Sequence, residues 1–283
     1  MTMKKLCIYH KNCLDGFGAA WVVRKAFGDN VEFHPGVYQE PPPDVTGRDV
    51  ILVDFSYKWE VVCEMRKKAS SMTIIDHHIT AIKDLCRVVD DQSGLCEIKM
   101  LLNKSCSGAY LAWAFYFTHD PVPRLIRHIQ DRDLWEWKLD GTREITAALA
   151  SYPYDFNLWD NFMTDDGCTR LCAEGAPITR QHMKNVYEAI ESGRRKLIID
   201  GIIVPAVNAS LFLASDIGNI LAAEAAFAAV YCDTPQGRSF SLRSTDQGRD
   251  VSEIAKKYGG GGHRNAAGFK VSLAESATFE LVE

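Results

Sequence analysis

The sequence lacks long apolar runs, an excess of positive charge and internal repeats, and each absence excludes a class of protein. No apolar stretch approaches the roughly 20 residues that a membrane-spanning helix needs. The chain has 32 Lys and Arg against 37 Asp and Glu, a net charge of −5, and residues 197–283 alone have 7 against 10. Because tight binding of long DNA or RNA draws on many phosphate contacts from basic side chains, we expect neither membrane association nor a long nucleic-acid partner.

Signals for secretion are also scarce. The first residues reach the polar His10-Lys11-Asn12 before any long apolar stretch of the kind found in signal peptides. The nine cysteines are odd in number and irregularly spaced, in a chain much larger than the small secreted domains that depend on disulfides. We therefore expect a cytoplasmic protein with free cysteines. A homodimer is compatible with the sequence, which does not specify the oligomeric state.

Short apolar segments alternate with helical patterns over the first ninety residues. Such alternation predicts parallel β–α–β units with helices on both faces of a sheet. The predicted strands are Lys5–Tyr9, Val31–His34, Val50–Phe55, Met72–Ile75 and Arg87–Val89, and the predicted helices are Gly16–Phe27 and Lys58–Ala69.

The remainder of the chain, which is long enough for two domains, predicts further helices and a second group of strands. We predict helices at Ser107–Phe117, Arg124–Gln130 and Ile178–Ile199, and one near Ile217–Ala226. The later predicted strands are Ile202–Val207, Ala228–Cys232 and Ser239–Leu242, with Phe269–Val271 closing the sheet. The fold class is therefore α/β, with a mainly parallel sheet in residues 1–176, a helical connector in 177–198 and a smaller α/β domain in 199–283.

Chemically active side chains follow several of these segments where each one ends. They are His10, Cys13 and Asp15 after the first strand, Asp54 at the end of the third, Asp76-His77-His78 after the fourth, and Asp131 and Asp133 at the end of a helix. Singly, such an Asp is more often a helix cap or turn residue, and a His pair is more often structural. Their meeting at the carboxyl edge of one sheet favours a metal site. Imidazole and carboxylate suit Mn²⁺, Fe²⁺ or Zn²⁺, and a bridging carboxylate can hold two metals for phosphoryl chemistry.

A second pattern lies near the C-terminus, where the glycine run 259–262 precedes His263 and Arg264. A glycine run alone is typical of a flexible linker, but here small residues and a strand follow at once. Glycines allow positive φ and close backbone approach, so we expect the run to present N–H groups to an anion ahead of a helix start. His263 and Arg264 would add charge-assisted hydrogen bonds. The run is neither a Walker A loop nor a dinucleotide-binding fingerprint.

These motifs together resemble the DHH phosphoesterase family in its two-domain form, a DHH domain followed by a DHHA1 domain. The triplet Asp76-His77-His78 after a strand is similar to the motif that names the family. The run Gly260-Gly261-Gly262-His263 with Ala266-Ala267-Gly268 is similar to the substrate-binding signature of the DHHA1 domain. The resemblance covers nearly the whole chain, with Asp15-Gly16, Asp54 and Asp131 at the other motif positions.

The resemblance implies hydrolysis assisted by two divalent cations, with Mn²⁺ as the first choice and Mg²⁺, Fe²⁺ or Zn²⁺ as alternatives. It implies that Asp54 bridges the cations and that His78 faces the scissile phosphate, so both are candidate catalytic residues. The implied metal ligands are His10, Asp15, Asp54, His77 and Asp131, with Asp133 as the second choice for the last position. The implied substrate-binding residues are Arg243, Gly260, Gly261, Gly262, His263 and Arg264.

Cys13 departs from the family pattern, because many relatives carry an Asp two residues before the Asp-Gly pair as a further metal ligand. A thiolate at that position can bind softer metals such as Zn²⁺ or Fe²⁺. Alternatively Cys13 packs, or supports a ligand, and leaves one metal site weak. We favour packing or support.

The resemblance implies a phosphodiesterase, and a cleft between the domains with a capped end favours short oligonucleotides or linear dinucleotides, cut to mononucleotides. The alternatives are pyrophosphate or polyphosphate, a cyclic mononucleotide or a nucleotide bisphosphate as substrate. A non-catalytic nucleotide-binding protein is the alternative of another class, supported by Cys13 alone. The aromatic residues Phe17, Tyr57 and Trp135 lie close to motif residues in the sequence, which mildly favours a substrate with a base to stack.

Overall fold

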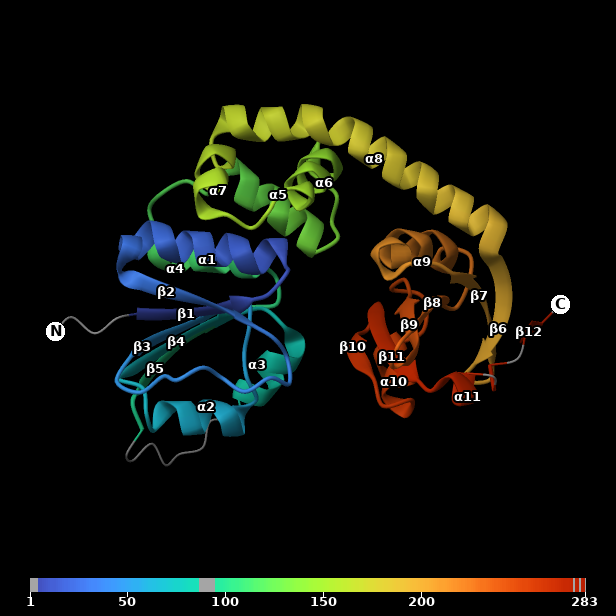
Figure 1. The fold of residues 1–283 in the computed structure, drawn as a ribbon, viewed down its shortest axis with the longest axis horizontal. Helices are drawn as coiled ribbons and strands as arrows, with labels where there is room; N and C mark the ends of the chain where they lie inside the picture. The colour runs from blue at the N-terminus through green and yellow to red at the C-terminus, as the bar shows by residue number, and fades with distance from the viewer. Residues whose placement is uncertain (1–4, 87–94, 277, 280, 283) are drawn as a thin grey trace. The chain divides into compact units, whose positions relative to one another are not determined.

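The computed structural model describes residues 5–86, 95–276, 278–279 and 281–282 (Figure 1). The chain folds into two compact units, Met1–Thr179 and Arg180–Glu283, and the boundary between them lies within the predicted connector. The predicted strand Arg87–Val89 lies outside the described residues. No helix in the described ranges is long and apolar enough to cross a membrane.

The N-terminal unit is built on a sheet of five strands in the order β2-β1-β3-β4-β5. Every neighbouring pair in it is parallel, which confirms the predicted parallel α/β domain. The strands are β1 (Lys5–His10), β2 (Val31–Gly36), β3 (Asp49–Val53), β4 (Ser71–Asp76) and β5 (Glu97–Leu102).

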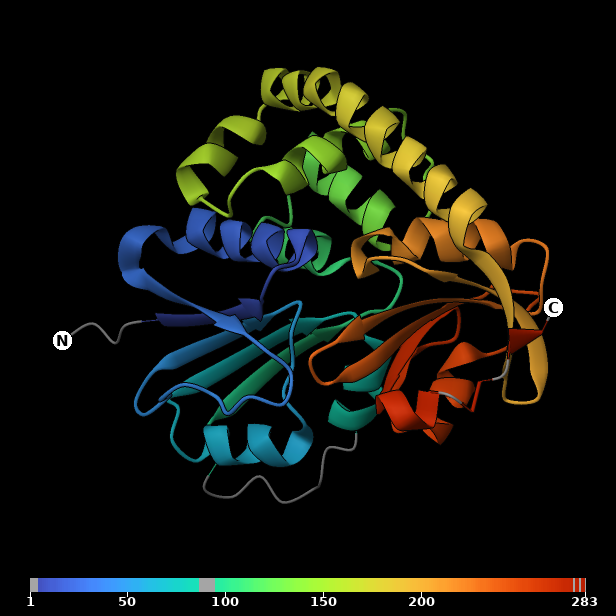
Figure 2. The same cartoon turned by 45° about the vertical axis from the view of Figure 1, so that its right-hand side comes forward.

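Alternation of side chains along the strands supplies an apolar core on each face of this sheet. In β1, Cys7 packs into one core while its neighbours Leu6 and Ile8 pack into the other. The two faces are therefore both covered by helices, as Figures 1 and 2 show. The first face is covered by α1 (Leu14–Phe27) and α4 (Gly108–Tyr116), and the second by α2 (Trp59–Arg66) and α3 (Ile79–Leu85). A short 3₁₀ turn at Gly28–Asn30 follows α1.

Further helices extend the first core and complete the unit. They are α5 (Arg124–Asp133), α6 (Thr142–Ser151), α7 (Phe156–Phe162) and α8 (Asp165–Gly193). Helix α8 corrects the predicted helix at Ile178–Ile199, because it starts earlier, passes through Pro177 and ends at Gly193. The last six residues of the predicted helix instead form β6 (Arg194–Ile199), where Leu197 and Ile199 are buried with the period of two expected of a strand.

The C-terminal unit is smaller and contains a seven-stranded sheet in the order β10-β11-β9-β8-β7-β6-β12. Its pairs are antiparallel except for the parallel pair β7 and β8. After β6 come β7 (Ile202–Asn208), a 3₁₀ turn (Leu211–Leu213), α9 (Ala214–Ala222), β8 (Ala228–Thr234), β9 (Gly237–Arg243), α10 (Val251–Lys257), β10 (Gly261–His263), β11 (Ala266–Val271), α11 (Leu273–Ser276) and β12 (Leu281–Val282). The prediction that Phe269–Val271 closes the sheet is wrong, because β11 lies inside it and pairs with both β9 and β10.

Helix α10 begins with a side-chain cap that makes the stability of this unit sensitive to acid. Asp250 Oδ1 accepts a hydrogen bond from the backbone N–H of Ser252 at 3.0 Å, and the Ser252 hydroxyl lowers the pKa of the Asp250 carboxyl. Asp250→Ala is expected to lower the free energy of unfolding by about 1 kcal/mol at neutral pH. A depressed folded-state pKa stabilises fully above the unfolded value of about 3.9, and this contribution is lost as the pH falls through the lower folded value, so the difference should shrink below about pH 4.

Urea denaturation of the full chain at neutral and acidic pH measures this difference. Asp250→Asn is the matched control, because its amide oxygen still accepts the Ser252 N–H and a loss of only a few tenths of a kcal/mol is expected. Equal losses for Ala and Asn would contradict the cap.

Candidate metal centre

Strand register brings the chemically active residues of the N-terminal unit to one edge of its sheet. Tyr9 pairs with Val53, and Val53 pairs with Ile75, so the next residues along the three strands, His10, Asp54 and Asp76, lie at the same carboxyl edge. The chain reverses direction across the sheet between β1 and β3, because β2 lies on one side of β1 and β3 on the other. Ligands of open α/β sheets bind at such a switch point.

Asp54 stands at the centre of the cluster. Its Oδ2 lies 3.6 Å from His10 Nδ1, and its Oδ1 lies 3.1 Å from His77 Nε2 and 3.9 Å from His78 Nδ1. The Asp54 side chain is only 1% exposed, whereas the three imidazoles are 13–28% exposed. One buried carboxylate is therefore surrounded by three nitrogen ligands that are partly open to solvent.

A second grouping shares His77 with two further carboxylates. His77 Nε2 lies 3.8 Å from Asp15 Oδ2 and 3.5 Å from Asp133 Oδ2. Asp15 is in the first turn of α1, and Asp133 is the last residue of α5. The ligand atoms of Asp15, His77 and Asp133 all lie within 4.8 Å of one another, as do those of Asp54, His77 and His78. The predicted residues from four separate segments therefore meet at one site.

Asp131, the first choice for the ligand at this position, does not join the cluster. Its carboxylate instead accepts hydrogen bonds from the backbone N–H groups of Lys138 (2.7 Å) and Leu139 (3.2 Å) and from the Thr142 hydroxyl (2.6 Å). Two positions along a helix are about 200° apart, so Asp131 and Asp133 point in nearly opposite directions. The preference for Asp131 is corrected to Asp133, and Asp131 holds the loop after α5.

The backbone and hydrogen bonding of Asp54 meet the requirements of a metal ligand. Its φ is +53°, a conformation that L-residues other than Asn and Asp rarely adopt and that often marks functional sites. Neither of its carboxylate oxygens receives a hydrogen bond from any residue within the described ranges, and the buried Nδ1 of His10 also has no such partner there. Buried polar atoms without hydrogen bonds are costly, and a cation between them would satisfy both. The residues present therefore fit a divalent metal.

The charges in the cluster lead to the same conclusion. Burial opposes ionisation of Asp54, but the neighbouring imidazoles outweigh it and hold the pKa of Asp54 below its ordinary value. Burial and the nearby Asp54 charge raise the pKa of both Asp15 and Asp133. Burial lowers the pKa of His77, yet the carboxylates around it raise that pKa to about 9. A cation bound among these carboxylates would neutralise the same cluster of negative charge.

Asp76 positions the histidines that follow it, a role that the sequence did not predict. Its Oδ1 accepts hydrogen bonds from the backbone N–H groups of His77 (2.7 Å) and His78 (3.1 Å) and contacts His78 Nδ1 at 2.7 Å. Its Oδ2 accepts a hydrogen bond from the Ser56 hydroxyl at 2.5 Å. Asp76 thereby fixes the orientation of the His78 ring through Nδ1.

The start of α4 also supports the cluster, through a glycine that sequence reasoning missed. The N–H groups of Gly108 and Ala109 donate to the two oxygens of Asp15 at 2.5 and 2.9 Å. A Cβ on Gly108 would lie 2.5 Å from Asp54 Cβ and 3.0 Å from Asp15 Oδ2, closer than real contacts allow. Only glycine therefore lets α4 approach the metal-binding carboxylates this closely.

Cys13 lies inside the cluster rather than in the apolar core. Its Sγ, a His10 ring nitrogen and an Asp54 oxygen all lie within 4.8 Å of one another. Burial, with the nearby Asp54 and Asp15 charges, raises the pKa of the Cys13 thiol well above its ordinary value. Of the two roles expected for Cys13, packing in the apolar core does not fit this position, whereas support of a ligand does, because the sulfur faces ligand groups.

The glycine run of the C-terminal unit forms a hairpin instead of preceding a helix. Gly261–His263 is β10, which pairs antiparallel with β11, so the predicted helix start is wrong. His263 and Arg264 are exposed at its turn, and Arg264 donates to the backbone oxygens of Asp246 and Gly248 at 3.1 Å each. Arg243, on β9, donates to the Ser215 hydroxyl at 2.9 Å, and its burial lowers the pKa of its guanidinium. The substrate-binding role of these residues remains a prediction.

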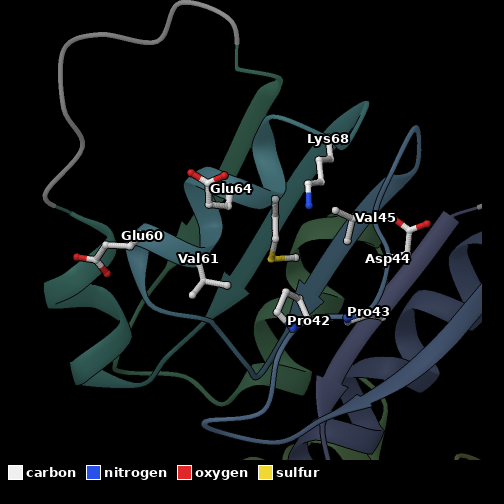
Figure 3. A pocket seen from close by; sticks show the side chains of 9 residues that line it. Pro42, Pro43, Asp44, Val45, Glu60, Val61, Glu64 and Lys68 are labelled. Carbon is white, nitrogen blue, oxygen red and sulfur yellow. The ribbon is translucent and has the colours of Figure 1, made fainter.

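A separate hollow of about 520 Å³ lies beside α2, and Figure 3 shows its lining. None of the residues that line it is a candidate metal ligand, so it belongs to a different part of the unit. The lining residues are Pro42, Pro43, Asp44, Val45, Glu60, Val61, Glu64, Met65 and Lys68.

The sequence of this chain is similar to known proteins over nearly its whole length. A family profile described as the DHHA1 domain matches residues 207–281. The protein "Uncharacterized protein R106" of Acanthamoeba polyphaga mimivirus is 30% identical over 305 residues, which span 98% of this chain and 70% of that protein. The chain belongs to the DHH/DHHA1 family. As a DHH/DHHA1 protein it is a metal-dependent phosphoesterase, which confirms the predicted class of enzyme.

More distant relatives are named for an activity. Oligoribonuclease NrnB of Bacillus subtilis is 22% identical over 299 residues, spanning 94% of this chain and 72% of NrnB. Two solved structures share the fold. The pGpG-specific phosphodiesterase PggH of Vibrio cholerae has 15% identity, 97% and 96% coverage of the two chains and a TM-score of 0.51. An exopolyphosphatase-related protein of Bacteroides fragilis has 13% identity, 98% and 90% coverage and a TM-score of 0.51.

Proposed function

We propose that this DHH/DHHA1 protein hydrolyses the phosphodiester of linear dinucleotides and very short oligonucleotides, releasing mononucleotides, with Mn²⁺ as the first-choice metal. The observation that carries this proposal is an exposed indole: Trp135 follows the candidate ligand Asp133 by two residues in the sequence and is 38% exposed. Exposed aromatic rings bind bases by stacking, worth about 1–3 kcal/mol per base. The similarity to NrnB, an oligoribonuclease, and to PggH, a phosphodiesterase specific for pGpG, supports the same substrate class.

The other aromatic residues suggested by the sequence are not available for stacking. Phe17 and Tyr57 are 3% and 8% exposed and belong to the two cores of the N-terminal unit. Trp135 is held by its surroundings, because its ring packs edge-on against Trp137 at a centroid distance of 4.9 Å. Arg143 in turn lies 4.0 Å above the Trp137 ring.

The residues of the cluster have separable tasks in this reaction. Two divalent cations bound there would supply Lewis-acid activation of a water molecule and neutralise charge on the phosphoryl oxygens. Asp54, His10, His77, Asp15 and Asp133 would hold those cations. His78, whose ring Asp76 orients, would face the scissile phosphate and donate a hydrogen bond or a proton to it. The raised pKa of His78, which burial opposes and the Asp76 carboxylate causes, favours the donating form.

Product chromatography with a panel of substrates tests this function. The purified chain is incubated with Mn²⁺ and a 5′-phosphorylated diribonucleotide, with pyrophosphate and a cyclic mononucleotide in parallel. Release of mononucleotides from the diribonucleotide alone is the expected result. Turnover of only pyrophosphate or only the cyclic nucleotide would replace the proposed substrate, and no turnover with any divalent metal would favour a non-catalytic nucleotide-binding role.

Trp135→Ala is expected to raise KM for the diribonucleotide by roughly 5- to 150-fold, the equivalent of one lost base stack. Trp135→Phe keeps an aromatic face and should lose much less. An abasic phosphodiester provides a second control, because its KM should be the same for wild type and Trp135→Ala. Equal effects of the Ala change on both substrates would mean that Trp135 shapes the metal centre rather than the base site.

A further inference from the structure

The metal-binding groups of the N-terminal unit fall into two sets with different chemistry. One set, His10, Cys13 and Asp54, offers a nitrogen, a sulfur and an oxygen within 4.8 Å of one another. The other, Asp15, His77 and Asp133, offers two carboxylates and one imidazole. Thiolate ligands select soft or borderline metals such as Zn²⁺ and Fe²⁺, whereas sets rich in carboxylate suit Mn²⁺ and Mg²⁺.

The sulfur of Cys13 is placed for coordination rather than for packing. Cys13 is the residue before α1 and has an extended backbone (φ −123°, ψ 134°). A sulfur there lies at the N-terminal end of a 14-residue helix, whose dipole favours an anionic ligand, while burial and the nearby carboxylates keep the thiol protonated until a cation is bound. The Asp54 and Asp15 carboxylates act on this thiol electrostatically, so its surroundings are charged rather than apolar.

Independent support comes from the two groups that share this set with Cys13. Both oxygens of Asp54, a residue 1% exposed, and the buried His10 Nδ1 have no hydrogen-bond partner within the described parts of the chain. These atoms lie beside the Cys13 sulfur, with ligand atoms of all three residues within 4.8 Å of one another. Three ligand types therefore share one small, partly buried space.

We propose that the dinuclear centre is asymmetric: His10, Cys13 and Asp54 bind a thiophilic divalent cation such as Zn²⁺ or Fe²⁺, and Asp15, His77 and Asp133 bind Mn²⁺ or Mg²⁺. The inference deepens the proposed function and rests on its metal centre. It assigns Cys13 as a metal ligand and predicts that full occupancy needs two different metals.

Cobalt spectroscopy of the full chain tests the sulfur ligand directly. After removal of metals by a chelator, Co²⁺ is added, and a thiolate-to-cobalt charge-transfer band in the near ultraviolet is expected for wild type. The band should vanish in Cys13→Ser and Cys13→Asp. Cys63→Ser is the matched control, because Cys63 is also partly buried but lies on α2 outside the cluster, and its variant should keep the band.

Equilibrium dialysis against Zn²⁺ and Mn²⁺ together provides the second readout. Wild type should retain one zinc and one manganese, whereas Cys13→Asp should retain manganese at both sites. Zinc affinity of Cys13→Ser should fall by more than roughly 10- to 100-fold, the range for mutating residues that merely support a ligand. If a variant fails to fold, peptide-resolved alkylation of wild type decides, because Zn²⁺ but not Mn²⁺ should protect Cys13.

The outcomes separate this inference from the proposed function. Absence of the band in wild type, its persistence in Cys13→Ser, or alkylation of Cys13 that Zn²⁺ does not slow would each overturn the thiolate ligand. A band and zinc retention that depend on Cys13, together with no hydrolysis of the diribonucleotide, would support the asymmetric centre and remove only the proposed substrate.

Discussion

Asp54→Asn is expected to abolish metal-dependent hydrolysis while the N-terminal unit stays folded. Asn keeps the volume of Asp and tolerates the positive φ at this position, so the backbone strain is not increased. It removes the negative charge around which His10, His77 and His78 are arranged. Activity should fall by at least roughly 10²–10³-fold, the loss measured for removing one preorganised electrostatic contact from an active site. Steady-state kinetics at saturating Mn²⁺ measure the loss.

Thermal unfolding separates a lost metal site from a lost fold. For wild type, Mn²⁺ at about 100 times its Kd should add about 2.7 kcal/mol to the free energy of unfolding. For Asp54→Asn that increment should largely disappear, while the metal-free protein unfolds at a temperature no lower than wild type. Asp49→Asn is the matched control on the same strand, because Asp49 pairs with Lys5 at 3.0 Å away from the cluster. Activity retained in Asp54→Asn would contradict the role of Asp54 as the carboxylate shared by two metals.

Gly108→Ala is expected to cost nearly as much activity, although the residue carries no chemical group. An added methyl group would meet the side chains of Asp54 and Asp15 at 2.5–3.0 Å, so the carboxylates or the start of α4 must move. Displacements of about 1 Å in an active site can cost on the order of 10²-fold in rate. In an exposed helix the same change would stabilise by about 0.5–1 kcal/mol, so the usual effect of this substitution is reversed here.

Ala114→Gly on the same helix serves as the matched control, because Ala114 is exposed and distant from the carboxylates. It should destabilise α4 by about 0.5–1 kcal/mol and leave kcat unchanged. Metal titration and kcat are measured for both variants. Full activity and unaltered metal affinity in Gly108→Ala would show that the cluster can relax around the methyl group.

The sequence predicted the N-terminal sheet well because its signal is local. Short apolar strands such as Val50–Phe55 alternate with helical patterns, and the period of two or 3.6 is readable without tertiary information. The predictions failed where two structures compete for similar residues. Arg194–Ile199 follows a long helix and carries helix-forming Arg and Lys, yet it pairs with β7 and becomes β6. The pairing energy of a distant strand is not visible in the local pattern.

In the candidate site, too, the local sequence predicted part of the arrangement but not the contacts between distant segments. The strand ends predicted that His10, Asp54 and His77 would meet, because parallel strands bring their carboxyl ends to one edge. Choosing Asp133 over Asp131 required the direction of each side chain, which the loop contacts of Lys138 and Leu139 settle. Asp76 appeared in the sequence only as part of the Asp76-His77-His78 motif, with no indication that it positions the two histidines. Nothing in the sequence indicated the role of Gly108, because that role arises from packing between segments that are 54 residues apart in the sequence (108 − 54).

The N-terminal unit is one continuous stretch of the chain, and this determines how early during synthesis the enzyme can bind its metals. Every candidate ligand lies between His10 and Asp133, and the unit's hydrophobic clusters use only residues before Thr179. The remaining 104 residues (283 − 179) take roughly 5–20 s to synthesise at about 5–20 residues per second. The ligand cluster can thus fold, and bind whichever cations are abundant around the ribosome, before the C-terminal unit has been made.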